Sequence, residues 1–205
     1  MTPEPPVESA RREALLEAAY RYALGHGLAQ LSLRPLAAAI GSSAGVLIYL
    51  FGSKEGLVRA VLARARAEEL ALLDRVGERG DRPAIGLAAA VEHLWGWLAA
   101  VEHRQLLTLW AETYATSLVE PDGVWGGFAA ATVHDWLAVL AACQPAEERD
   151  GTDGAARRTL ALAVLRGALL DLLATGDDGR VSAAVHHQVS VLAVSDGTAP
   201  RRREP

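Results

Sequence analysis

A small group of polar and basic residues in the N-terminal third has the side-chain types needed for binding a polyanion. Arg34, Ser43, Tyr49 and Lys54 lie close together in the sequence, inside or beside short apolar runs. Guanidinium, ammonium and hydroxyl groups bind phosphate oxygens, and Arg and Ser side chains also hydrogen-bond to the edges of bases. These residues therefore favour recognition of a nucleic acid over bond-making chemistry.

Two short helices joined by a tight turn are predicted to position these side chains. Ser32 is a suitable cap for the first helix, and Pro35 lies in its first turn, where the missing N–H costs nothing. Gly41 ends this helix because glycine accepts a positive φ. Leu47 and Phe51, four residues apart, lie on the inner face of the second helix. Two helices with a glycine in the turn predict a helix-turn-helix.

The order of residues in this stretch resembles the N-terminal domain of the TetR family of bacterial transcriptional regulators. The resemblance covers residues 9–66 and includes a turn at Gly27 and a long helix that opens at Ser53. It is carried by Gly27, Leu31-Ser32-Leu33-Arg34, Leu36-Ala37, Gly41, Ser43, Leu47, Tyr49, Phe51 and Ser53-Lys54-Glu55.

The resemblance implies a DNA-recognition helix and a phosphate contact from Lys54, at the start of the next helix. A lysine opposes the helix dipole at that end, which makes sense where a phosphate binds nearby. The expected DNA-binding residues are Ser32, Arg34, Ser43, Ala44, Gly45, Tyr49 and Lys54.

Two positions of the recognition helix depart from the family pattern. Leu50 stands where members usually carry His or Tyr, and Ile48 stands where many carry Tyr. The helix has no Arg, Lys, Asn or Gln, the residues that read bases in bidentate fashion. Discrimination then depends on Arg34, Ser43, Tyr49, contacts to thymine methyl groups and DNA shape.

Charge is distributed unevenly along the 205 residues, which carry a net charge of −5. Residues 1–66 contain 8 Lys and Arg against 5 Asp and Glu, and residues 67–205 contain 12 against 20. The positive balance lies at the end predicted to meet phosphates. Cys143 has no partner for a disulfide, and Glu92 and His93 interrupt the longest apolar run, so we expect a cytoplasmic chain without a membrane span.

The composition predicts an all-α fold in two parts. Hydrophobic residues make up 51% of the chain, Ala and Leu are frequent, and no segment alternates strictly. We expect a helix-turn-helix domain at 9–56, a ligand-binding and dimerisation bundle at 57–195, and disordered ends at 1–8 and 196–205. A continuous helix from Lys54 to Val76 joins the parts, and further helices are predicted at 83–101, 104–119, 124–143, 155–175 and 181–194.

All five Trp residues lie between positions 95 and 136, in three successive predicted helices. Each one alone is explained by core packing, whereas the group is equally compatible with an aromatic-walled pocket. The resemblance favours the pocket, because this region holds the inducer in the family. Glu112 is a candidate for a cationic ligand, although an ion pair explains it as well. The candidate ligand-binding residues are His93, Trp97, Trp110, Thr113, Tyr114, Ser117 and Trp136.

The last two helices carry apolar stripes that predict burial on more than one side. The resemblance implies that these helices pair with the same helices of a second copy, which gives the homodimer that two half-sites need. The expected dimerisation residues are Leu162, Leu165, Leu169, Leu172, Val185, Val189 and Leu192.

No sequence motif supports an enzyme. HExxH, Glu-x-x-His, Walker A and Gly-rich dinucleotide patterns are absent, and no cofactor or metal is expected. The sequence favours a homodimeric repressor that binds a palindromic double-stranded DNA operator and is released by an apolar or aromatic small molecule. The alternative is a helical protein–protein adaptor whose DNA-binding surface has degenerated.

Overall fold

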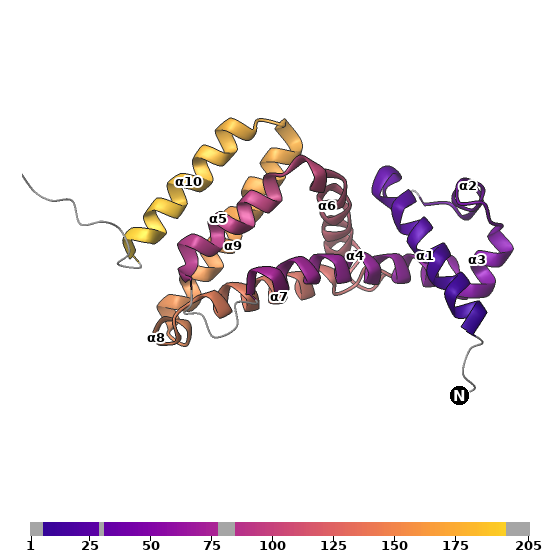
Figure 1. Cartoon of the computed structure of the whole chain (residues 1–205), viewed down its shortest axis with the longest axis horizontal. Helices are drawn as coiled ribbons and strands as arrows, with labels where there is room; N and C mark the ends of the chain where they lie inside the picture. Colours follow the sequence, from indigo (N-terminus) through magenta and orange to yellow (C-terminus); the bar gives the residue numbers. More distant parts are fainter. Residues whose placement is uncertain (1–5, 29–30, 78–84, 196–205) are drawn as a thin grey trace, which may run out of the picture. The chain divides into compact units, whose positions relative to one another are not determined.

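The structure is a computed structural model that describes residues 6–28, 31–77 and 85–195 (Figure 1). Within these ranges all regular structure is helical, as the sequence predicts. The chain divides into two compact units, Met1–Leu70 with Gln105–Ala130 and Ala71–Arg104 with Ala131–Pro205. We call them the N-terminal unit and the C-terminal unit.

The N-terminal unit combines the predicted helix-turn-helix with parts of two longer helices. It contains α1 (Pro6–His26), α2 (Leu33–Ala39), α3 (Ala44–Phe51), the first part of α4 (Lys54–Gly77) and nearly all of α6 (Arg104–Val119). Its core is formed by small and branched apolar side chains at helical spacing. They include Ala19, Tyr20, Ala23, Leu28, Leu36, Leu47, Leu57, Val58, Val61, Leu107 and Leu109.

A half-buried arginine fastens α4 to α1. Arg64 donates from Nε to Glu17 Oε2 (2.9 Å) and from Nη1 to Glu68 Oε2 (2.9 Å). Its guanidinium carbon also lies 4.7 Å from the ring centre of the buried Tyr20. The Glu17 ion pair and the cation–π contact with Tyr20 therefore join α4 to α1 at one point, while Glu68 lies on α4 itself.

The C-terminal unit is built around three helices. α5 (Gly86–Ala99) and α10 (Asp178–Ser195) pack against each other, and both pack against α9 (Thr152–Thr175) (Figure 1). The 3-10 turn η1 (Val101–His103), most of α7 (Phe128–Cys143) and α8 (Ala146–Arg149) complete the unit. Trp95 Nε1 donates to Ser182 Oγ (2.9 Å), which ties α5 to α10 inside the packed layer.

Several boundaries differ from the sequence prediction. α1 begins at Pro6 instead of Ser9, since proline fits the first turn of a helix. The predicted helix 83–101 ends at Ala99, and the stretch between the predicted helices 124–143 and 155–175 contains the short α8. The expected disorder at 1–5 and 196–205 falls outside the described residues.

The compact units also differ from the predicted domains 9–56 and 57–195. α6 groups with the N-terminal helices, and α4 is shared between the units. The reason is that the first turns of α4 bury Leu57, Val58 and Val61 in the N-terminal core. Among the described residues no single helix is long and apolar enough to cross a membrane, and α2 with α3 meets that composition only as a pair bent by 103°.

Candidate nucleic-acid interface and ligand-binding residues

α2 and α3 form the predicted helix-turn-helix. Their axes differ in direction by 103°, within the range of this motif. Gly41 adopts φ +65° in the turn, and the hydroxyl of Ser43 accepts the N–H of Val46 (3.3 Å) to cap α3. Ser32 occupies the cap position of α2, but its hydroxyl makes no capping hydrogen bond, so that part of the prediction is wrong. The Ser32 carbonyl instead accepts the N–H of Leu36 (3.2 Å).

Most of the expected DNA-binding side chains are exposed on this motif. Tyr49 is the extreme case, with 74% of its surface exposed, while Leu47 and Phe51 of the same helix are buried. The helix thus holds one large aromatic ring in solvent while packing its opposite face. Ala44 is half-buried, and the exposed members of the expected set are Ser32, Arg34, Ser43, Gly45, Tyr49 and Lys54.

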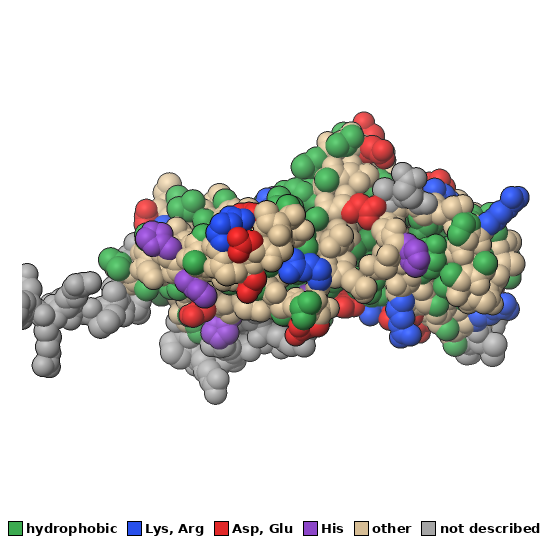
Figure 2. Space-filling view, turned by 90° about the horizontal axis from the view of Figure 1, so that it is seen from above, with side chains coloured by type: hydrophobic (Ala, Val, Ile, Leu, Met, Phe, Trp, Pro, Cys, Tyr) green, Lys and Arg blue, Asp and Glu red, His purple; other side chains and the backbone are tan. Residues whose placement is uncertain are grey.

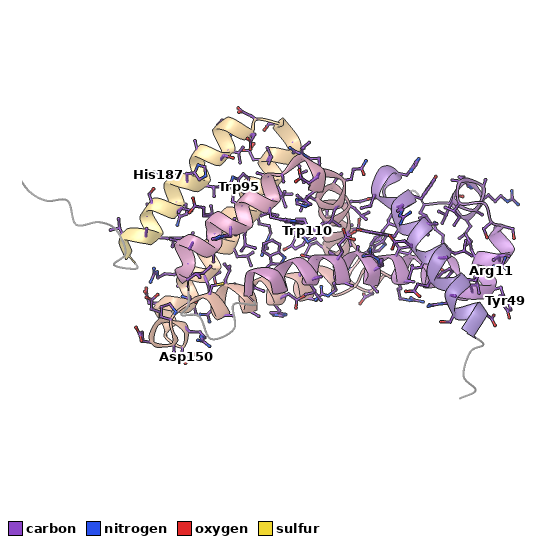
Figure 3. The ribbon with its side chains drawn as sticks, in the orientation of Figure 1. Arg11, Tyr49, Trp95, Trp110, Asp150 and His187 are labelled. Carbon is purple, nitrogen blue, oxygen red and sulfur yellow. The ribbon has the colours of Figure 1, made fainter. Side chains whose placement is uncertain are left out.

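An open groove of about 580 Å³ lies between the start of α1 and α3. Arg11 and Tyr49 extend from these two helices toward the same end of the unit (Figure 3). Basic side chains reach the surface at this end (Figure 2). The groove is lined by Glu8, Arg11, Ser43, Gly45, Val46, Tyr49 and Leu50.

The two adjacent arginines of α1 have different surroundings, which the sequence does not distinguish. Arg11 is exposed in the groove. Arg12 is half-buried, donates from Nε to the carbonyl oxygen of Leu50 (3.3 Å) and lies 5.0 Å from the ring centre of Phe51. The spacing of about 100° between neighbours on a helix explains the difference. Only Arg11 is placed to meet a phosphate in the groove.

The first turn of α4 favours negative charge. Ser53 Oγ accepts the N–H of Gly56 (3.0 Å) and so caps α4, and Lys54 is exposed beside it. Two hydrogen bonds to the Glu55 carboxyl hold its pKa below the ordinary value. The larger effect comes from the backbone N–H of Glu55 and the smaller one from the Ser53 hydroxyl. The positive end of the helix dipole and the exposed lysine together suit a phosphate oxygen.

Four of the expected ligand-binding residues lie on α6, in the N-terminal unit. Trp110 and Tyr114 stack at a tilt, with ring centres 5.0 Å apart. The Trp110 indole N–H is buried and has no hydrogen-bond partner among the described residues. Thr113 donates to the carbonyl oxygen of Leu109 (2.7 Å), and Ser117 Oγ accepts the N–H of Ala129 (3.2 Å). Both hydroxyls thus hold backbone groups of the unit.

The other three expected ligand residues lie in the C-terminal unit. Trp97 stacks on His103 with ring centres 4.2 Å apart, and its buried indole N–H also lacks a partner within the described chain. Trp136 is buried. His93 is exposed, and one ring nitrogen lies 2.6 Å from the carbonyl oxygen of Ala89, so its place in a pocket stays a prediction.

Glu112 has a contact that the sequence did not predict. Both carboxylate oxygens accept the backbone N–H of Leu28, at 3.2 Å for Oε1 and 3.1 Å for Oε2. The carboxylate lies against Gly27, which adopts φ +75° in the turn after α1. The contact joins α6 to the turn after α1, and the cationic ligand and the ion pair considered for this residue both stay predictions.

The expected dimerisation residues are packing residues of a single chain, which corrects the prediction. Six of the seven are buried within the C-terminal unit, and Val189 is half-buried. A different stripe on α9 reaches solvent at spacings of three and four residues. It consists of Ala156, Leu160, Ala163, Gly167, Leu170 and Ala174, with Ala184, His187, Val191 and Val194 exposed on α10.

Within the described ranges no group of three or more His, Cys, Asp or Glu side chains is placed to hold a metal ion. The one cysteine, Cys143, is buried at the end of α7.

Residues 15–61 match the sequence model described as "Bacterial regulatory proteins, tetR family". The chain is 30% identical over 112 residues to the HTH-type transcriptional regulator BetI of Stenotrophomonas maltophilia (strain R551-3). That match spans 53% of this chain and 57% of BetI, so it covers little more than half of the relative.

Solved structures share the fold over nearly the whole chain. A structure of the multidrug binding protein EbrR complexed with proflavin is 26% identical, with a TM-score of 0.59, and the match covers 87% of this chain and 99% of EbrR. A structure described as a putative TetR-family transcriptional regulator from Rhodococcus sp. is 18% identical, with a TM-score of 0.70 and coverage of 89% and 98%. Together with the helix-turn-helix geometry, these matches show that residues 15–61 form the N-terminal domain of the tetR family of bacterial regulatory proteins, whose members are regulators and not enzymes.

Proposed function

We propose that the chain is a DNA-binding transcriptional repressor that acts as a homodimer and is released by a small aromatic or apolar molecule. The observation that carries this proposal is the exposed face of α2 and α3. Tyr49, Arg34 and Ser43 are held in solvent by helices whose inner faces are buried. Such a face is suited to a partner, because Tyr49 and the neighbouring exposed Ile48 place apolar area beside basic and hydroxyl groups.

The charge of the motif and of the helices beside it supports DNA as the partner. Arg11, Arg34 and Lys54 are all exposed on the N-terminal unit, and Lys54 stands where the N-terminus of α4 favours an anion. Because α3 has no side chain for bidentate base contacts, affinity depends on phosphates, with discrimination from Tyr49, Arg34 and DNA shape.

The unpartnered indole N–H groups support a small-molecule effector with a hydrogen-bond acceptor. A buried N–H without an acceptor costs free energy, and Trp97 and Trp110 each carry one within their own unit. EbrR, the neighbour complexed with proflavin, makes an aromatic effector a reasonable class to test. An effector must bind the DNA-incompetent state more tightly, and a hundredfold preference corresponds to about 2.7 kcal/mol.

A second copy is proposed to cover the exposed stripe on α9 and the exposed residues of α10. Leu160 is 54% exposed, Leu170 is 49% exposed, and Gly167 between them meets no other atom within 4 Å of an added Cβ. Small and apolar side chains at three- and four-residue spacing allow two helices to approach closely. Two copies would present two recognition helices to a palindromic operator.

Fluorescence anisotropy with DNA from upstream of the chain's own gene tests the proposal. A scrambled fragment and a salt series accompany it, because phosphate contacts make the affinity depend on salt. A preference of a hundredfold or more for the native fragment is the expected result.

Lys54→Ala and Arg34→Ala separate the two kinds of contact. Lys54→Ala should weaken binding to all sequences and flatten the salt dependence, whereas Arg34→Ala should reduce the preference between fragments. Equal and weak binding of the unmodified chain to native and scrambled DNA would contradict the proposal and favour the protein–protein adaptor.

A further inference from the structure

We propose that Glu112 is the positioning residue through which α6 holds the turn after α1. An effector then acts on the DNA-binding helices by withdrawing the Glu112 carboxylate from this turn. The proposal concerns the regulation of the proposed repressor and rests on that function for its consequence at DNA. All the residues in the argument lie in the N-terminal unit.

The contact joins two segments that are 84 positions apart in the sequence. Both oxygens of the half-buried Glu112 carboxylate accept the N–H of Leu28, at 3.1 and 3.2 Å. The side chain of Leu28 is buried, and its carbonyl oxygen accepts the N–H of Leu31 (3.0 Å), just before α2 begins at Leu33. The position of the Leu28 peptide therefore bears on where α2 starts.

The turn is shaped to admit the carboxylate. Gly27 adopts φ +75°, and a Cβ at this position would lie 2.8 Å from Glu112 Oε2. Only glycine satisfies both the backbone angle and the close approach. The fit between the turn and the carboxylate makes this contact specific to Glu112.

α6 carries the candidate effector residues on the face opposite this contact. Trp110 and Tyr114 are four residues apart and share a face, while Glu112 lies roughly 200° around the helix from Trp110. The buried Trp110 N–H has no partner within the described residues, so an acceptor bound there would gain a hydrogen bond. A helix is stiff across its own width, and displacement of the Trp110 face moves Glu112 with it.

Threonine hydroxyls make α6 adaptable along its length. Thr113 donates to the carbonyl oxygen of Leu109 (2.7 Å), and Thr116 donates to that of Glu112 (2.8 Å). Such bonds to the preceding turn often bend helices. The bond from Thr116 ends on the carbonyl oxygen of Glu112, the same residue whose carboxylate accepts the Leu28 N–H.

Hydrogen exchange of the Leu28 amide in the full chain tests the proposal without DNA or effector. Mass spectrometry with electron-transfer fragmentation would follow the Glu112→Ala, Trp110→Ala and double variants, with Glu120→Ala as an exposed acidic control after α6. We expect Leu28 to exchange about tenfold faster or more in Glu112→Ala, because a charge-assisted hydrogen bond is lost. Trp110→Ala alone should also speed exchange of the Leu28 amide. The double variant should exchange no faster than Glu112→Ala, because both changes remove the same contact.

Glu112→Gln keeps a neutral acceptor on a side chain of the same length, so it tests the contact even if the alanine variant misfolds. The Leu28 amide should exchange in this variant at a rate between those of the unmodified chain and Glu112→Ala. Amides in the buried turns of α4 must keep their rates, since general loosening would speed these as well. Two results would overturn the proposal. One is that Trp110→Ala speeds exchange of the Leu28 amide by the same factor whether residue 112 is Glu or Ala. The other is that Glu112→Ala leaves the exchange rate of this amide unchanged. If neither the unmodified chain nor any variant binds DNA, the repressor function is contradicted. The exchange rates of the Leu28 amide would still test the contact between Glu112 and the turn.

Discussion

Neighbouring residues of the same type have separate roles in this protein, as Arg11 and Arg12 show. Arg12 binds the Leu50 carbonyl oxygen and the face of Phe51, so it closes α1 onto the end of α3. Arg11 stands exposed in the groove beside Tyr49. The two residues form a matched pair, since one contributes to packing and the other to the proposed contact with DNA.

Arg12→Ala should lower the free energy of unfolding by about 1–2 kcal/mol, the sum of a side-chain hydrogen bond and a cation–π contact. Arg11→Ala should leave unfolding unchanged within about 0.5 kcal/mol and should weaken binding to all DNA sequences. Urea unfolding and DNA anisotropy across a salt series measure the two effects. A stability loss in Arg11→Ala equal to that in Arg12→Ala would contradict the assignment.

At the scale of elements, close backbone approach decides which glycines are required. Gly56 lies in the first turn of α4, where an added Cβ would meet the carbonyl oxygen of Phe51 at 2.0 Å. Gly96 is exposed within α5, and no atom lies within 4 Å of such a Cβ. The same substitution should therefore have opposite effects at the two positions.

Gly96→Ala should stabilise the chain by about 0.5–1 kcal/mol, because alanine has less freedom to lose on folding. Gly56→Ala should destabilise it by more than about 2 kcal/mol, because α3 and α4 must separate. Thermal unfolding followed by circular dichroism measures both. Stabilisation by both changes would mean that α3 and α4 part easily at this junction.

The connection between α9 and α10 provides a test of electrostatics at the same scale. Arg180 bonds both oxygens of Asp171, at 2.6 and 2.7 Å, and this hydrogen bonding holds the pKa of Asp171 below its ordinary 3.8. A carboxyl whose pKa is lowered on folding contributes stability above its ordinary pKa, and that contribution is lost as pH falls through the lower value. Unfolding curves between pH 5 and about pH 2.5 should show a steeper loss for the unmodified chain than for Asp171→Asn. Parallel curves would show that the pair contributes nothing.

At the scale of the whole molecule, burial separates the residues that fold one chain from those available to a second. Leu165 is buried within the C-terminal unit, while Leu160 and Leu170 are exposed on the same helix. Figure 2 looks onto α10, where apolar and histidine side chains reach the surface. The exposed stripe is the surface proposed for the dimer.

Leu170→Glu should shift the chain from dimer to monomer while the protomer keeps its helical content, because the carboxylate would be desolvated at the contact. Leu165→Ala should instead destabilise the protomer by about 2–5 kcal/mol through a cavity in its core. Sedimentation velocity and circular dichroism distinguish the two results. A dimer that survives Leu170→Glu would remove the stripe from the interface.

The sequence by itself determined the helices and the helix-turn-helix, because local signals specify them. Gly41, Ser43 and Ser53 fix turns and caps through their own backbone angles and hydroxyl groups, and apolar residues at helical spacing fix the inner faces. The bounds of α6 follow from sequence for the same reason, and the order of residues around Gly27 and Lys54 identifies the family.

Only the tertiary structure decided which side of each helix is covered and by what. An apolar stripe predicts burial, but it does not say whether the cover comes from the same chain or from another. The sequence therefore predicts an interface at leucines of α9 that pack within one chain. The roles of Arg12 and Glu112 depend on carbonyl and amide groups from α3 and from the turn after α1, which are distant in sequence. Contacts of this kind carry no periodic signal, because a backbone group can serve as partner whatever its side chain.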